Sequence, residues 1–139
     1  MGRWLALIAV VVSLVACGAA APTATMTGCA ATGGQQVYAL LEGYSVRWTQ
    51  AAERADTAQL AAMGAEIEAL KAIRNELNGQ QFPTCGKAAQ AAFVAWMDTI
   101  IEGFTAEMQQ KPRAESNAIF ERARAQQDAL KAELQKLPR

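Results

Sequence analysis

Hydrophobic side chains recur along most of this chain at the three- and four-residue spacing that marks the buried face of an α-helix. The first stripe, in a helix that we expect to begin near Gln35, consists of Val37, Leu41, Tyr44 and Trp48. The second consists of Leu60, Met63, Ile67, Leu70, Ile73 and Leu77. The third consists of Phe93, Trp96, Met97, Ile100, Phe104 and Met108. The last consists of Phe120, Ala123, Leu130, Leu134 and Leu137. No segment alternates like a strand, so the sequence predicts an all-α fold.

Glycine and proline mark most of the helix boundaries. Asn78-Gly79 supplies a stop for the second stripe, since both residues tolerate a positive φ. Pro83-Thr84 opens the next helix, with Thr84 as the candidate N-cap. That helix should end near Gln110, because Pro112 cannot continue it without strain. The last helix is then predicted to run from about Pro112, at its first position, to about Lys136.

The boundary between the first two stripes is less clear from the sequence. Asp56 and Gln59 can form a variant of the capping box, which predicts a break near residues 55–57. No glycine or proline enforces that break. The chain is therefore expected to form an antiparallel up-down bundle of four helices, and the alternative is three helices with a long first one.

A possible cysteine pair favours the four-helix arrangement. Cys29 precedes the first helix and Cys85 opens the third. In an oxidising compartment two such cysteines are expected to form a disulfide. One straight helix over residues 35–78 would separate its ends by about 65 Å, whereas a fold-back near Asp56 returns the start of the domain to the neighbourhood of Cys85.

The N-terminal segment has the pattern of an export signal. Met1 to Arg3 carries one positive side chain, and Trp4 to Val15 is apolar apart from Ser13. This apolar stretch is shorter than the roughly 20 residues that span a bilayer, and it suits a signal peptide. Residues 14–17, Leu-Val-Ala-Cys, follow directly.

These four residues resemble the lipobox of bacterial lipoproteins. The resemblance covers residues 1–18 and implies cleavage before Cys17, a diacylglycerol on its sulfur, and further acylation, such as palmitate, of the new amino group. Two or three acyl chains make a stable anchor. The alternatives are an ordinary secretory signal cut after a later alanine, or an uncleaved anchor. The expected localisation is on a bacterial membrane, at its outer face or periplasmic side, and Gly18 permits outer-membrane sorting.

Three segments follow from this interpretation. Residues 1–16 are the signal peptide, residues 17–34 are a lipidated flexible tether rich in Ala, Thr and Gly, and residues 35–139 are the helical bundle domain. As a coil, the tether would span on the order of 20–25 Å. Beyond Cys17 the motifs indicate no known family.

The charge balance and the missing histidine exclude several classes of function. The chain has 13 basic and 13 acidic side chains, and removal of Arg3 with the signal leaves 12 against 13. A nucleic-acid partner requires a basic surface, so none is expected. Without histidine, a histidine-based triad or an imidazole zinc site cannot form. Asp98, beside the third stripe, is the one carboxylate worth testing for catalysis, and we expect a protein that is not an enzyme.

The remaining candidates are binding roles. Met63, Met97 and Met108 could suggest a thioether copper site, but methionine at this spacing is typical of core packing, so no metal and no cofactor are expected. Aromatic residues could line a site for a small apolar ligand inside the bundle. The candidate ligand residues are Trp48, Phe93, Trp96 and Phe104, with Tyr38 and Tyr44 nearby. By elimination, the first expectation is an anchored binding or structural module for an envelope protein, and the ligand carrier is the alternative.

Overall fold

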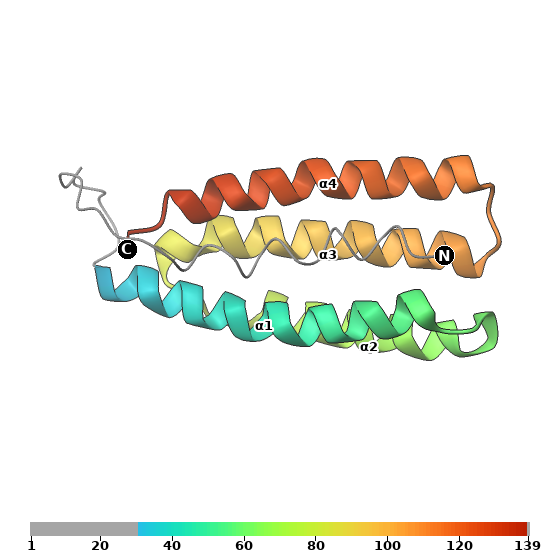
Figure 1. The fold of residues 1–139 in the computed structure, drawn as a ribbon. Helices are drawn as coiled ribbons and strands as arrows, with labels where there is room; N and C mark the ends of the chain where they lie inside the picture. Colours follow the sequence, from blue (N-terminus) through green and yellow to red (C-terminus); the bar gives the residue numbers. More distant parts are fainter. Residues whose placement is uncertain (1–30, 139) are drawn as a thin grey trace.

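The computed structural model describes residues 31–138 and folds them into an antiparallel, up-and-down bundle of four helices (Figure 1). The helices are α1 (Ala31–Thr57), α2 (Leu60–Gly79), α3 (Lys87–Met108) and α4 (Arg113–Gln135), with a short 3-10 helix, η3 (Thr84–Gly86), before α3. α2, α3 and α4 each pack along the helix that precedes them in the sequence. The all-α, four-helix prediction is confirmed, and the alternative of three helices with a long first one is wrong.

The bundle has two ends that differ in what they contain (Figure 1). The start of α1, the connection over residues 80–86 and the C-terminal residues 136–138 lie at one end, here called the proximal end. The turn over residues 58–59 and the turn over residues 109–112 lie at the opposite, distal end. Tyr38 ties α1 to α4 near the proximal end, because its hydroxyl donates a hydrogen bond to the carbonyl of Leu134 at 2.6 Å.

The predicted stripes form the core of the bundle. In α2, five of the six stripe residues are buried, namely Met63, Ile67, Leu70, Ile73 and Leu77. The sixth, Leu60, is 45% exposed because it is the first residue of α2, beside the distal turn. In the other helices, Tyr44, Ile100, Met108 and Leu134 are only partly buried, and the remaining stripe residues are buried.

The break between α1 and α2 lies at Ala58–Gln59, two to three residues later than predicted, and its mechanism is different. Asp56 belongs to the last turn of α1 and does not cap α2. Gln59 occupies the N-cap with extended backbone (φ −67°, ψ 152°) and makes no side-chain capping bond, so the predicted capping box is wrong. Thr57 closes α1 instead, because its hydroxyl donates to the carbonyl of Glu53 at 2.9 Å.

The first helix also begins earlier than expected. α1 starts at Ala31, whereas the sequence predicted a tether up to residue 34. Gly34 is buried, and a Cβ at that position would come within 2.0 Å of the carbonyl oxygen of Pro138. Glycine therefore serves close packing of α1 on the C-terminal residues here, a use that composition alone does not distinguish from a flexible tether.

Both proline-marked boundaries shift by one or two residues. Pro83, not Thr84, stands at the N-cap of η3, and Thr84 is the first residue of that 3-10 helix, so the predicted Thr84 cap is wrong. α3 ends at Met108, because Gln110 adopts a positive φ of 55°. Pro112 is the N-cap of α4 and not its first helical residue.

Candidate functional site

Three of the four aromatic residues predicted to bind a ligand lie together in the core. The ring centroids of Trp48 and Trp96 are 5.8 Å apart, and those of Phe93 and Trp96 are 5.7 Å apart. Trp48 is 1% exposed, and Phe93 and Trp96 are buried as well. The rings fill the space between α1 and α3 by packing against one another, as aromatic side chains in a close-packed core do.

The fourth residue, Phe104, belongs to a different contact. Its ring meets Phe120 of α4 edge to face, with the centroids 6.0 Å apart. Phe120 also lies against Gly103, where a Cβ would come within 2.6 Å of the ring. The structure therefore divides the predicted set between an α1–α3 cluster and an α3–α4 contact.

One polar atom in the aromatic cluster is unusual. The indole Nε1 of Trp48 is buried and has no hydrogen-bond partner among the described residues. A buried donor without an acceptor costs roughly 1–3 kcal/mol relative to a paired one. This atom is the one buried donor of the cluster that packing alone leaves without an acceptor among the described residues.

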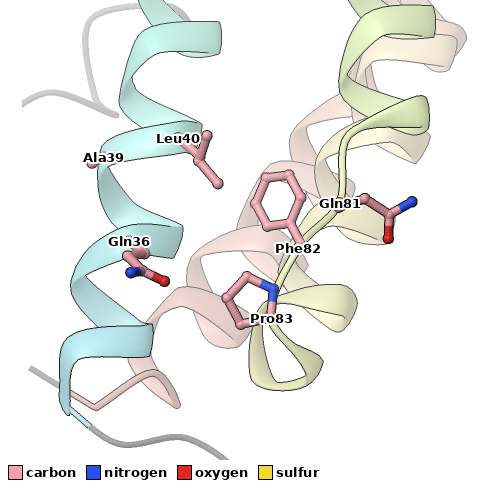
Figure 2. A pocket seen from close by; sticks show the side chains of 6 residues that line it. All are labelled: Gln36, Ala39, Leu40, Gln81, Phe82 and Pro83. Carbon is pink, nitrogen blue, oxygen red and sulfur yellow. The ribbon is translucent and has the colours of Figure 1, made fainter.

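An open apolar groove lies elsewhere, at the proximal end (Figure 2). We call it the proximal groove; it holds about 650 Å³ and is lined by Gln36, Ala39, Leu40, Gln81, Phe82 and Pro83. Figure 2 shows Leu40 of α1 and Phe82 of the 80–83 segment pointing toward one another, while the side chain of Gln81 points away from α1. The lining is mostly apolar, and its polar groups are uncharged carboxamides.

Two local contacts hold in place the wall of this groove that residues 81–83 form. The side-chain amide of Gln90 donates to the carbonyls of Leu77 (2.7 Å) and Gln80 (2.9 Å), which holds the chain as it leaves α2. Gly86 packs on α1 so closely that a Cβ there would come within 2.4 Å of a methyl carbon of Val37. The connection over residues 80–86 is therefore clamped to both α1 and α3.

Charged residues are distributed unevenly around the groove. No charged residue occurs between Arg3 and Glu42, or between Glu76 and Lys87. Both walls of the proximal groove belong to these uncharged stretches. Elsewhere at the proximal end, α4 carries the pair Glu133–Lys136 and α3 begins at Lys87. The helix ends and turns of the distal end carry Glu53, Arg54, Asp56, Glu107, Lys111, Arg113 and Glu115.

Asp98, the carboxylate considered for catalysis, takes part in an ion pair between helices. The Nε of Arg74 in α2 donates to its Oδ1 at 2.6 Å. This pair is one of several bridges between neighbouring helices, another being Arg47 with Glu76 at 2.7 Å. In the described residues 31–138, no three Cys, Asp or Glu side chains lie close enough to hold a metal ion.

The methionines considered for copper are part of the hydrophobic packing. Met63 and Met97 are buried core residues, and Met108 packs against the core at the end of α3.

Glu107, next to Met108, has a carboxyl whose pKa is raised, because burial disfavours its charged form and Asp56 adds a negative charge nearby.

Two of the predicted cysteine sites, Cys17 and Cys29, lie outside the described residues. Cys85 is half-buried in η3 and packs against the core at the proximal end.

The proximal groove was not predicted from the sequence. The one signal for it is Phe82-Pro83, an apolar pair in an otherwise polar connection, and its counterpart Leu40 stands outside the first helical stripe.

None of the helices in residues 31–138 combines the length and apolar character needed to cross a membrane. Comparison with protein-family models, with curated proteins and with solved structures finds no match for this chain.

Proposed function

We propose that this chain is an exported bacterial lipoprotein, cut before Cys17, whose helical bundle is a non-enzymatic module that binds another envelope component. The observation that carries the proposal is the position of the ends of the bundle. α1 begins at the proximal end, and we therefore expect an anchor that precedes it in the chain to hold the bundle by that end. The distal end then points away from the membrane and is free to meet a partner.

The character of the distal end supports a protein partner. It carries acidic and basic side chains together, among them the pairs Arg54–Glu66 (3.0 Å) and Lys111–Glu115 (2.5 Å). A surface of mixed sign gives orientation and selectivity with a complementary protein surface, and it gives little attraction to nucleic acid.

The proposal also includes a disulfide bond at the proximal end of the bundle. We expect Cys29 and Cys85 to form a disulfide within one chain. α1 begins two residues after Cys29, and Cys85 lies at the same end of the bundle, next to the Gly86 contact with α1. Such a bond would join the tether to η3 and limit how far the bundle can turn away from its anchor.

The anchor is tested directly by mass spectrometry. The N-terminal peptide of protein taken from the host membrane should begin at Cys17 and carry the mass of its acyl chains, and Cys17→Ser should lose both the acyl mass and the cleavage. A Ser variant that is still cut before residue 17 and held on the membrane would contradict the lipoprotein proposal.

The partner is tested by photo-crosslinking in the native host. A photoreactive amino acid replaces the exposed Gln109 at the distal end, and Gln135, exposed near the proximal end, is the matched control. We expect a protein adduct from position 109 and none from position 135. Adducts from position 135 alone would place the partner at the wrong end for this proposal.

A carrier of a small apolar ligand is the second candidate, and the unpartnered Nε1 of Trp48 beside Trp96 and Phe93 favours it. A ligand with one acceptor and an apolar body would satisfy that donor. Native mass spectrometry of protein extracted from cells should then show a retained lipid-like mass. A bare chain mass under conditions that preserve the fold would exclude the carrier role.

A further inference from the structure

We propose that the proximal groove binds the glycerol-ester region of membrane phospholipids and tilts the bundle toward its α1 side, while the distal end stays clear of the membrane. This inference rests on the proposed function, because it takes the membrane to be the surface to which Cys17 is attached. It goes further in naming the contact, the lipid chemistry and the orientation of the bundle.

The chemistry of the groove fits that level of a bilayer. Ala39 and the half-buried Leu40 and Pro83 offer apolar surface for the first methylene groups of an acyl chain, and the buried Phe82 forms the floor beneath them. Gln36 adds a carboxamide whose N–H groups can donate to ester carbonyls. Burial of such a surface against lipid costs no desolvation of charge, since neither wall carries a charged residue.

Proximity strengthens what would otherwise be a weak contact. Residues 18–30 join Cys17 to α1, and a flexible chain of that length would span roughly 20 Å. A tether of this length raises the effective concentration of the groove at the lipid surface to about the millimolar range. A groove with only weak intrinsic affinity for lipid is then occupied for much of the time.

The position of the groove along α1 determines how the bundle must lie. α1 has 27 residues, and at 1.5 Å per residue its length is about 40 Å. Gln36 to Leu40 lie about 7–14 Å from its start. The headgroup layer of one leaflet is only about 5–8 Å thick. An upright bundle would hold the groove above the glycerol esters, whereas a bundle tilted toward α1 brings the groove to their level.

Two tryptophan reporters test this arrangement on the acylated full-length mature protein in phosphatidylcholine vesicles. Ala39→Trp places an indole at the groove, and Ala61→Trp places one on the exposed distal start of α2. Brominated phosphatidylcholine should quench and blue-shift the added emission of Ala39→Trp and leave that of Ala61→Trp unchanged. Gln36→Trp, at another exposed position that lines the groove, gives a second reporter should Ala39→Trp disturb α1.

A charge placed at the groove provides the matched control. Gln36→Glu, combined with the Ala39→Trp reporter, should abolish the quenching, because lipid contact would then desolvate a carboxylate. Gln109→Glu makes the same change at an exposed position of the distal turn and should leave the quenching intact. The quenching should also persist at high salt and be equal in neutral and anionic vesicles, since no charge takes part.

The possible results separate this inference from the proposed function. An acylated protein whose groove reporters are not quenched overturns the lipid contact and leaves the lipoprotein proposal standing. A mature chain without acyl groups on Cys17 overturns both. A blue shift of Ala39→Trp that grows with protein concentration in the absence of vesicles assigns the groove to a second copy of this chain and overturns the lipid contact.

Discussion

The contact between Gly103 and Phe120 predicts a clear effect of adding one methyl group. An ideal Cβ on Gly103 would lie 2.6 Å from two carbons of the Phe120 ring, whereas carbon atoms in contact stay about 3.5–4.0 Å apart. The ring or the α3–α4 spacing must therefore move by about 1 Å. Overpacking of this kind costs roughly 1–3 kcal/mol.

The same substitution has an opposing, favourable part. Replacing glycine by alanine inside a helix gains about 0.5–1 kcal/mol. We expect the packing cost at Gly103 to exceed this gain, so that Gly103→Ala destabilises the bundle by about 1–2 kcal/mol. For a domain of roughly 100 residues, this lowers the unfolding midpoint by about 5–15 °C.

Gly43→Ala is the matched control, because a Cβ on Gly43 meets no atom within 4 Å. Only the helix-propensity gain applies there, and the midpoint should rise by a few degrees. Thermal and urea unfolding of the mature chain, followed by circular dichroism, measures both variants. In a Phe120→Leu background, Gly103→Ala should lose most of its cost. If Gly103→Ala stabilised the protein as much as Gly43→Ala, the tight α3–α4 approach would be refuted.

Three further predictions concern covalent structure, ionisation and the non-enzymatic role. Non-reducing peptide mapping should recover Cys29 and Cys85 in one linked pair, and reduction should destabilise the protein by roughly 4 kcal/mol for a loop of this length; free thiols at both positions would contradict the pairing. Burial, and then the charge of Asp56, raise the pKa of Glu107, so its charged form opposes folding. Glu107→Gln should therefore be more stable than the parent at pH 7, and this gain should vanish as the pH falls below the ordinary value of 4.5; equal stability at both pH values would contradict it. Asp98→Asn should lower stability by no more than about 1 kcal/mol, because the ion pair with Arg74 is still partly open to solvent, and should leave partner crosslinking unchanged, whereas loss of a measured turnover would indicate catalysis.

The sequence predicted the all-α class and the buried face of each helix because the helical spacing of apolar residues reports burial directly, but it left three helices open as an alternative to four. Met63 to Leu77 is buried as that spacing predicts. The boundaries were harder because they depend on backbone choices that single residues do not determine. Gln59 separates α1 from α2 by its extended backbone, without a side-chain capping bond. Gly34 packs closely against Pro138, although its neighbours have the composition of a tether.

The candidate sites were less predictable than the fold. The aromatic residues were correctly placed in the interior, but periodicity gives the face of a helix and not the partner across it. Phe104 therefore meets Phe120, and only Trp48, Phe93 and Trp96 form a cluster. The proximal groove joins Leu40 to Phe82, which are far apart in the sequence, so no local pattern could indicate it.

The order in which the helices pack also affects how the protein folds. Each helix packs mainly against helices adjacent to it in the sequence, and the α3–α4 contact is the most extensive, so most contacts between helices close short loops. Proteins with such local contacts fold in microseconds to milliseconds. The contacts between α1 and α2 involve no residue of α3 or α4. This first pair of helices can therefore form before the rest of the chain has been synthesised or exported. We expect the last step to be the docking of the end of α4 on α1, marked by the hydrogen bond between Tyr38 and Leu134.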